Sequence, residues 1–151
     1  MPENILKEQE RRFCEIVQKI DRLYEDYARS RGMTYMSMSV LEAICQLGDS
    51  CTQKQICRQT HYPKQSVNLI VKALWQAGHV ALEELPEDRR NKRILLTDAG
   101  RAYAQKTVGP LWEIDREATA RLTAEQRETL LRLLSVYADA YEQGVRQAEA
   151  E

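Results

Sequence analysis

The sequence lacks several features that would place it in common functional classes. Nowhere do 18 apolar residues follow one another, so no segment is expected to span a membrane. There are only two histidines, and there is no glycine-rich phosphate loop, nucleophile elbow or histidine-bearing metal motif. We therefore expect a protein that is not an enzyme and that uses neither a cofactor nor a metal.

One long stretch also lacks acidic residues. Residues 50–82 contain no Asp or Glu, although they contain four Lys or Arg. The net charge of −1 hides this asymmetry, because residues 51–101 carry 9 basic and 5 acidic side chains while both flanking thirds are acidic. A solvated surface normally carries both signs, whereas a surface that faces phosphates does not. The middle of the chain is therefore the candidate for nucleic-acid contact.

The N-terminal segment has no apolar core flanked by a cleavage site, so we expect a cytoplasmic protein. In that reducing compartment the four cysteines should be thiols, each most simply explained as a small buried hydrophobe. Three of them are spaced by six residues, and no CxxC pairing is present, which argues against zinc.

Both ends of the chain have the periodicity of long amphipathic helices. Apolar residues recur every three or four positions over residues 5–30. Residues 101–146 show the same pattern, interrupted at Gly109-Pro110, and a capping box of Thr123 with Gln126 opens the last helix. One small domain cannot cover these apolar stripes, so we expect a homodimer.

Residues 37–100 predict three short helices followed by two strands. Thr52 with Gln55 matches the capping box of a short helix, and Pro63 suits the first turn of the next, which should end before Gly78. In that next helix apolar and polar residues fall on opposite faces. The polar face is free of acids and consists of Gln65, Asn68 and Lys72, with Lys64 and Ser66 at the N-terminal end.

The two strands predict a hairpin with a basic tip. Apolar and polar residues alternate in 80–82 and 94–96, and Pro86-Glu87-Asp88 is a turn sequence. The segment that follows the turn carries four basic residues, Arg89, Arg90, Lys92 and Arg93. A basic hairpin next to an acid-free helix has the pattern of a DNA-reading wing.

These residues resemble the MarR family of bacterial winged-helix regulators. Asp88-Arg89-Arg90, followed by Leu96-Thr97 and Gly100, is similar to the family's Asp-x-Arg, Leu-Thr-x-x-Gly signature at the same spacing. The resemblance implies one chain, 1–151, of mainly α class with a small antiparallel β wing. In it, a winged helix-turn-helix core at 37–100 is flanked by dimerisation helices at 5–30 and 101–146.

By this resemblance the protein is a homodimeric transcriptional regulator that binds a pseudo-palindromic double-stranded operator. Family habit makes it a repressor that releases DNA when a ligand or an oxidant changes the spacing of its two reading heads. The helix carrying Gln65 and Asn68 would enter the major groove, and Arg90, held by Asp88, would enter the minor groove. Phosphate contacts are expected from Lys64, Ser66, Lys72, Arg89, Lys92 and Arg93.

Several interpretations stay open. Cys14 lies where the family's organic-hydroperoxide sensors carry a reactive cysteine, and the alternative is a packed thiol. Trp75 is interpreted as a packing residue. An alternative function is a winged helix used for protein assembly without DNA binding. A pocket for a small-molecule effector, or else ordinary core, would be formed by Tyr24, Met33, Tyr35, Met36, Met38 and Trp112.

Overall fold

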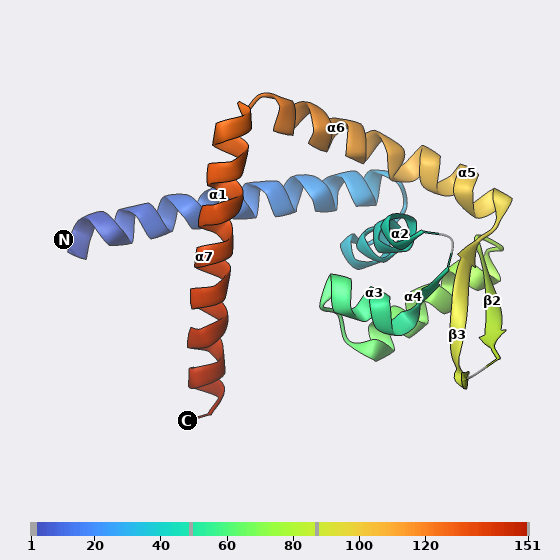
Figure 1. Ribbon diagram of the computed structural model, residues 1–151. Helices are drawn as coiled ribbons and strands as arrows, with labels where there is room; N and C mark the ends of the chain where they lie inside the picture. The colour runs from blue at the N-terminus through green and yellow to red at the C-terminus, as the bar shows by residue number, and fades with distance from the viewer. Residues whose placement is uncertain (1–2, 49, 87, 151) are drawn as a thin grey trace. The chain divides into compact units, whose positions relative to one another are not determined.

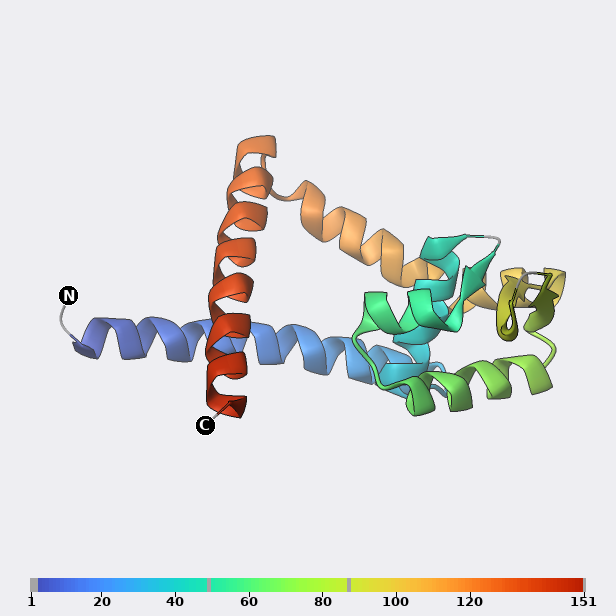
Figure 2. The ribbon, with the colours of Figure 1, turned by 60° about the horizontal axis from the view of Figure 1, so that its bottom comes forward.

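The computed structural model describes residues 3–48, 50–86 and 88–150, and the side chains at positions 88–91 lie outside this description. Residues Met1–Gly109 form one compact unit and Pro110–Glu151 a second (Figures 1 and 2). The predicted class, mainly helical with a small antiparallel sheet, is confirmed. The elements are α1 (Glu3–Ser30), α2 (Tyr35–Leu47), β1 (Cys51–Thr52), α3 (Gln53–Thr60), α4 (Lys64–Gln76), β2 (Val80–Leu85), β3 (Asp88–Leu96), α5 (Asp98–Thr107), α6 (Gly109–Ala120) and α7 (Ala124–Glu149).

The junction between α1 and α2 is set by two local signals. Gly32 has a φ of 72°, which lets the chain turn back so that the Met33 N–H donates to the Ala28 carbonyl at 3.0 Å. Thr34 then caps α2, because its Oγ1 accepts the Ser37 N–H at 3.1 Å. The sequence pattern predicted a start near Ser37, two residues late, because the cap residue Thr34 lies before the apolar pattern.

The core of the first unit is built on α2, which contacts α3, α4 and α5. Met38, Leu41 and Ile44 of α2 are fully buried, as are Ile56 of α3 and Val67 of α4. Burial of each such side chain contributes about 1.5 to 3 kcal/mol before the entropy of ordering is subtracted. In both views the first half of α1 extends away from this cluster (Figures 1 and 2).

The sheet has three antiparallel strands in the order β1-β3-β2. The β2–β3 hairpin pairs Val80 with Leu96 and Leu82 with Ile94, so the predicted strands are confirmed. The two-residue strand β1 was not predicted. It places Cys51 opposite Ile94, and this pairing attaches the hairpin to the helical core.

The second unit consists of α6 and α7. Gly109-Pro110 splits the fifth predicted helix as expected, and the capping box of Thr123 with Gln126 is present, with both hydrogen bonds made. No described residue of α7 is buried, and its apolar stripe is between 42% and 64% exposed at Leu130, Leu133, Leu134, Tyr137, Tyr141 and Val145. Among the helices of the described ranges, none is both long enough and apolar enough to cross a membrane.

Candidate nucleic-acid interface

Helix α4 carries the centre of the candidate interface, because its two sides differ in character. Val67, Val71 and Leu74 are at most 7% exposed and face the core, as the periodicity predicts. The opposite side is solvent-exposed and free of acidic residues, and presents Gln65, Asn68 and Lys72. Lys64 is also exposed at the start of the helix, while Ser66 is half-buried.

The turn before α4 is closed by a histidine in a conformation that favours glycine. His61 has φ 57° and ψ 20°, the left-handed region. This explains how the helix-turn-helix turn forms in a chain with no glycine at that point. The start of α3 is tied to the start of α4, because Gln53 Nε2 donates to the Lys64 carbonyl at 2.8 Å. Pro63 precedes α4 and has no side chain that could cap its first amides, so this positive helix end stays available to an anion.

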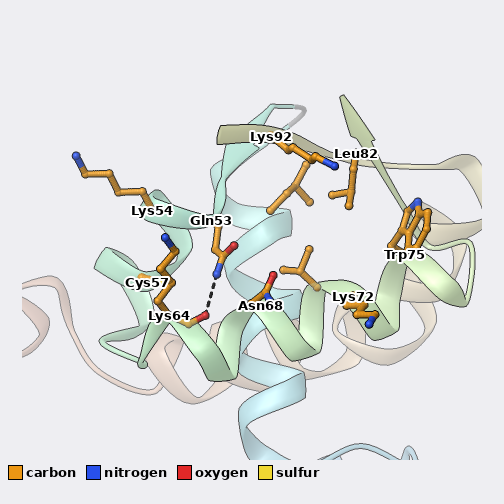
Figure 3. Close-up of a pocket in the computed structure, with 11 residues that line it drawn as sticks. Gln53, Lys54, Cys57, Lys64, Asn68, Lys72, Trp75, Leu82 and Lys92 are labelled. Atoms are coloured by element: carbon orange, nitrogen blue, oxygen red, sulfur yellow. Dashed lines mark hydrogen bonds between the residues drawn. The ribbon is translucent and has the colours of Figure 1, made fainter. Parts of the chain in front are cut away.

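A cavity of about 640 Å³ opens between α3, α4 and the hairpin (Figure 3). Three of its lining side chains, Val71, Leu82 and Ile94, are aliphatic, and no acidic residue is among the described residues that line it. Four lysines among these lining residues raise the local positive potential and favour an anionic occupant. We call it the lysine cavity, after Lys54, Lys64, Lys72 and Lys92; Gln53, Cys57, Asn68 and Trp75 complete its lining.

The interpretation of Trp75 as a packing residue is wrong. Its side chain is 50% exposed and lines the lysine cavity, with Lys72 from the same helix (Figure 3). In the sequence Trp75 follows Leu74, but the sequence alone could not show whether the tryptophan would lie on the buried or on the exposed side of α4. The structure thus adds an aromatic surface to the candidate interface.

The two basic residues of the hairpin that are fully described face different directions. Lys92 lines the lysine cavity with Ile94, and successive side chains of a strand alternate, so Arg93 lies on the other face of β3. In the register, Arg93 is opposite Glu83 and Lys92 is opposite Glu84, so carboxylates on β2 offset part of the positive charge. The structure therefore groups Lys92 with Lys64 and Lys72 but does not group Arg93 with them.

The basic tip of the wing is described only in its backbone. Asp88 starts β3 and pairs with Leu85, and the pairing then jumps to Lys92 opposite Glu84, so an irregularity lies between. The expected roles of Asp88, Arg89 and Arg90 depend on their side chains, which lie outside the described residues. Minor-groove contact by Arg90 stays a prediction.

The expected effector pocket is only partly assembled. The rings of Tyr24 and Tyr35 lie 4.6 Å apart, and Tyr24 donates a hydrogen bond to Glu42 at 3.0 Å. Burial, together with Glu42, raises the pKa of the Tyr24 hydroxyl, so it stays a donor. Met38 is fully buried and belongs to the core, while Met33 and Met36 are half-buried. Trp112 belongs to the second unit, so its place relative to these residues is not defined.

The cysteines differ in exposure. Cys14 is exposed within the chain, so here it is not the packed thiol that formed the alternative to a redox sensor. The nearby Arg11 pairs with Glu8 and Glu15. Cys51 is buried and Cys45 half-buried, and burial raises the pKa of both thiols to about 11, which disfavours the reactive thiolate. Among the described residues, no three His, Cys, Asp or Glu are placed to hold a metal ion.

Helices α2, α3 and α4, the short strand β1 between α2 and α3, and the β2–β3 hairpin together define a winged helix-turn-helix domain. A family model described as the MarR family matches residues 31–91. This match confirms the resemblance to the MarR family that the sequence signature indicated. No curated protein matches the chain closely enough to be counted as a relative.

Solved structures share the fold over almost the whole chain. NMB1585, a MarR family regulator from Neisseria meningitidis, is 24% identical with a TM-score of 0.78, covering 92% of this chain and 97% of that one. A cysteine-to-serine mutant of MarR from E. coli, complexed with operator DNA, is 24% identical with a TM-score of 0.65, covering 91% and 98%. Bordetella bronchiseptica BpsR, whose DNA binding is regulated by 6-hydroxynicotinic acid, is 21% identical with a TM-score of 0.66, covering 84% and 90%.

Proposed function

We propose that this protein is a sequence-specific DNA-binding transcriptional regulator. The observation that carries the proposal is the continuous acid-free surface of α4 and the lysine cavity, in a chain whose net charge is −1. Concentrating positive charge on one surface of an otherwise acidic protein is what binding to a polyanion requires. The fold that this chain shares with the MarR–operator complex supports the same role.

In this proposal the exposed side of α4 enters the major groove, which is wide enough to admit a helix. Gln65 and Asn68 read base edges there, since a side-chain amide can pair with adenine through two hydrogen bonds. The phosphate contacts that fix the orientation come from the free N-terminal end of α4 and from Lys64, Ser66, Lys72 and Lys92, with Arg89 and Arg93 as weaker candidates. Arg90, oriented by Asp88, enters the adjacent minor groove.

The regulator acts as a homodimer on a pseudo-palindromic operator. Within the first unit, Ile16, Ile20 and Leu23 of α1 are each about 60% exposed, and α7 exposes its own apolar stripe. Long apolar stripes on two helices are larger than the patches that monomers usually expose, and a second copy would cover them. Sedimentation equilibrium at micromolar concentration should give the dimer mass. A folded monomer under these conditions would contradict both the assembly and recognition of a palindrome.

We further propose that the regulator is a repressor that responds to a ligand or an oxidant. The regulated binding of BpsR supports an effector, and its proposed site is the polar surface formed by the half-buried Tyr24, which donates to Glu42, and the exposed Tyr35 beside it. Transcription in vitro from a promoter that contains the selected operator measures the sign of regulation. Repression that a candidate effector relieves is the expected result, while activation or an unchanged rate would contradict this part of the proposal.

The DNA-binding proposal is tested by the salt dependence of duplex affinity. Fluorescence anisotropy should show binding that weakens steeply with salt, and Lys72→Ala should reduce the slope of log K against log salt by about 1 per subunit. Lys7→Ala is the matched control, because Lys7 is an exposed lysine of α1 that pairs with Glu3 at 2.7 Å, outside the proposed interface. If no duplex binds, or if both variants behave alike, the protein-assembly function should be adopted instead.

A further inference from the structure

Leu69 is the most exposed large apolar side chain of the described residues, with 67% of its surface accessible. Most other exposed apolar side chains lie on α1 and α7, where a second copy would cover them. Leu69 lies instead on α4, so dimerisation through the terminal helices gives no reason for its exposure. Single exposed leucines are common on protein surfaces, and the significance of this one rests on its position.

Helical geometry places Leu69 on the exposed side of α4, beside the proposed DNA-reading residues Gln65 and Lys72. At 100° per residue, Leu69 is about 160° from both Val67 and Val71, and so points almost directly away from the core. Gln65 lies one turn before it and Lys72 one turn after it, on the same exposed side. When α4 enters a major groove by this side, the leucine is among the first side chains to meet the base edges.

We propose that Leu69 reads the C5-methyl group of a thymine in each half-site. This inference rests on the proposed DNA-binding function and adds an apolar reader to its polar ones. In the major groove the thymine methyl is the feature of the base pairs that an apolar side chain can recognise, because the other distinguishing groups are hydrogen-bond donors and acceptors. Contact removes both the methyl and the leucine from water, and both changes are favourable.

Leu69 complements the polar readers of the same helix. A side-chain amide selects adenine by hydrogen bonds, and Asn68 lines the lysine cavity with Lys72, on one side of the reading surface (Figure 3). Leu69 lies about 100° around the helix from Asn68. The two residues therefore reach different base positions, and their contributions to specificity should be separable.

The test removes only the methyl group from the DNA. A duplex site is first selected in vitro with the wild-type protein, and each thymine is then replaced in turn by deoxyuridine, which keeps every base-pairing and groove hydrogen bond. At one position in each half-site we expect wild-type affinity to fall about fourfold per half-site and about fifteenfold when both are replaced, as burial of one methyl group predicts. Leu69→Ala should bind the thymine and deoxyuridine sites equally well.

Two variants control the result. Asn68→Ala should lose preference for a base pair at another position but keep the wild-type difference between thymine and deoxyuridine. Leu69→Met keeps an apolar side chain and should retain part of that difference. Circular dichroism should show that all three proteins fold, since Leu69 and Asn68 are exposed and their truncation leaves no cavity.

The outcomes separate this inference from the function on which it rests. If the protein selects a site but no deoxyuridine substitution weakens it, or if Leu69→Ala still discriminates, methyl reading by Leu69 is refuted while DNA binding stands. If no duplex is selected at all, the proposed function fails, and the inference about Leu69 falls with it.

Discussion

Replacing Gly100 with alanine should destabilise the protein, although alanine normally strengthens a helix. Gly100 lies in the first turn of α5, and a Cβ there would come within 1.8 Å of the His79 carbonyl oxygen and 2.7 Å of its carbonyl carbon. Both neighbours are backbone atoms and cannot rotate away. They also belong to a hydrogen-bonded junction, in which Thr97 donates its N–H to His79 O at 3.1 Å and its hydroxyl to Gly78 O at 2.6 Å.

The size of the effect follows from three opposing contributions. Helix propensity favours alanine over glycine by about 1 kcal/mol, whereas overpacking against a rigid neighbour costs about 1 to 3 kcal/mol. Separating α5 from the junction would also weaken both Thr97 hydrogen bonds, at about 1 kcal/mol each. We expect the free energy of unfolding of Gly100→Ala to fall by roughly 2 to 4 kcal/mol, a large share of a typical domain's stability.

Urea unfolding followed by circular dichroism measures this change as a lower midpoint at unchanged slope. Gly144→Ala is the matched control, because Gly144 lies in α7 and a Cβ there would meet nothing within 4 Å. It should raise stability by about 0.5 to 1 kcal/mol. If Gly100→Ala unfolds at the same urea concentration as wild type, or a higher one, the close approach of α5 to the α4–β2 connection is not what requires this glycine.

Three further predictions use other sites. His61→Gly should raise stability by up to about 1 kcal/mol in the same urea assay, because glycine takes the left-handed conformation without the penalty that histidine carries; a loss would contradict this. At pH 8, iodoacetamide should alkylate Cys14 well before Cys45 and Cys51, whose raised pKa keeps them protonated, and peptide mass spectrometry would show the order. Arg90→Ala should weaken operator binding by about 1 to 3 kcal/mol and make its salt dependence less steep. If this variant binds with wild-type affinity, the wing is not part of the DNA interface.

Local signals made much of the fold predictable from the sequence. The capping box of Thr52 with Gln55 needs only neighbouring residues, and it forms as expected. The strand β1 was missed because two residues carry no periodicity, and its partners Arg93 and Ile94 are some 40 positions away. The left-handed His61 was missed because an unusual backbone conformation at a non-glycine residue is imposed by the elements on either side.

The composition of the candidate interface was less predictable than its elements, because it depends on register. Lys92 lines the lysine cavity and Arg93 does not, yet a one-residue slip of β3 would exchange them. Two attachments prevent that slip. At one, Cys51 of β1 pairs with Ile94, and at the other, the Thr97 N–H holds the His79 carbonyl where β3 ends. Sequence patterns identified the basic hairpin, but these long-range contacts decide which of its charges lies beside α4.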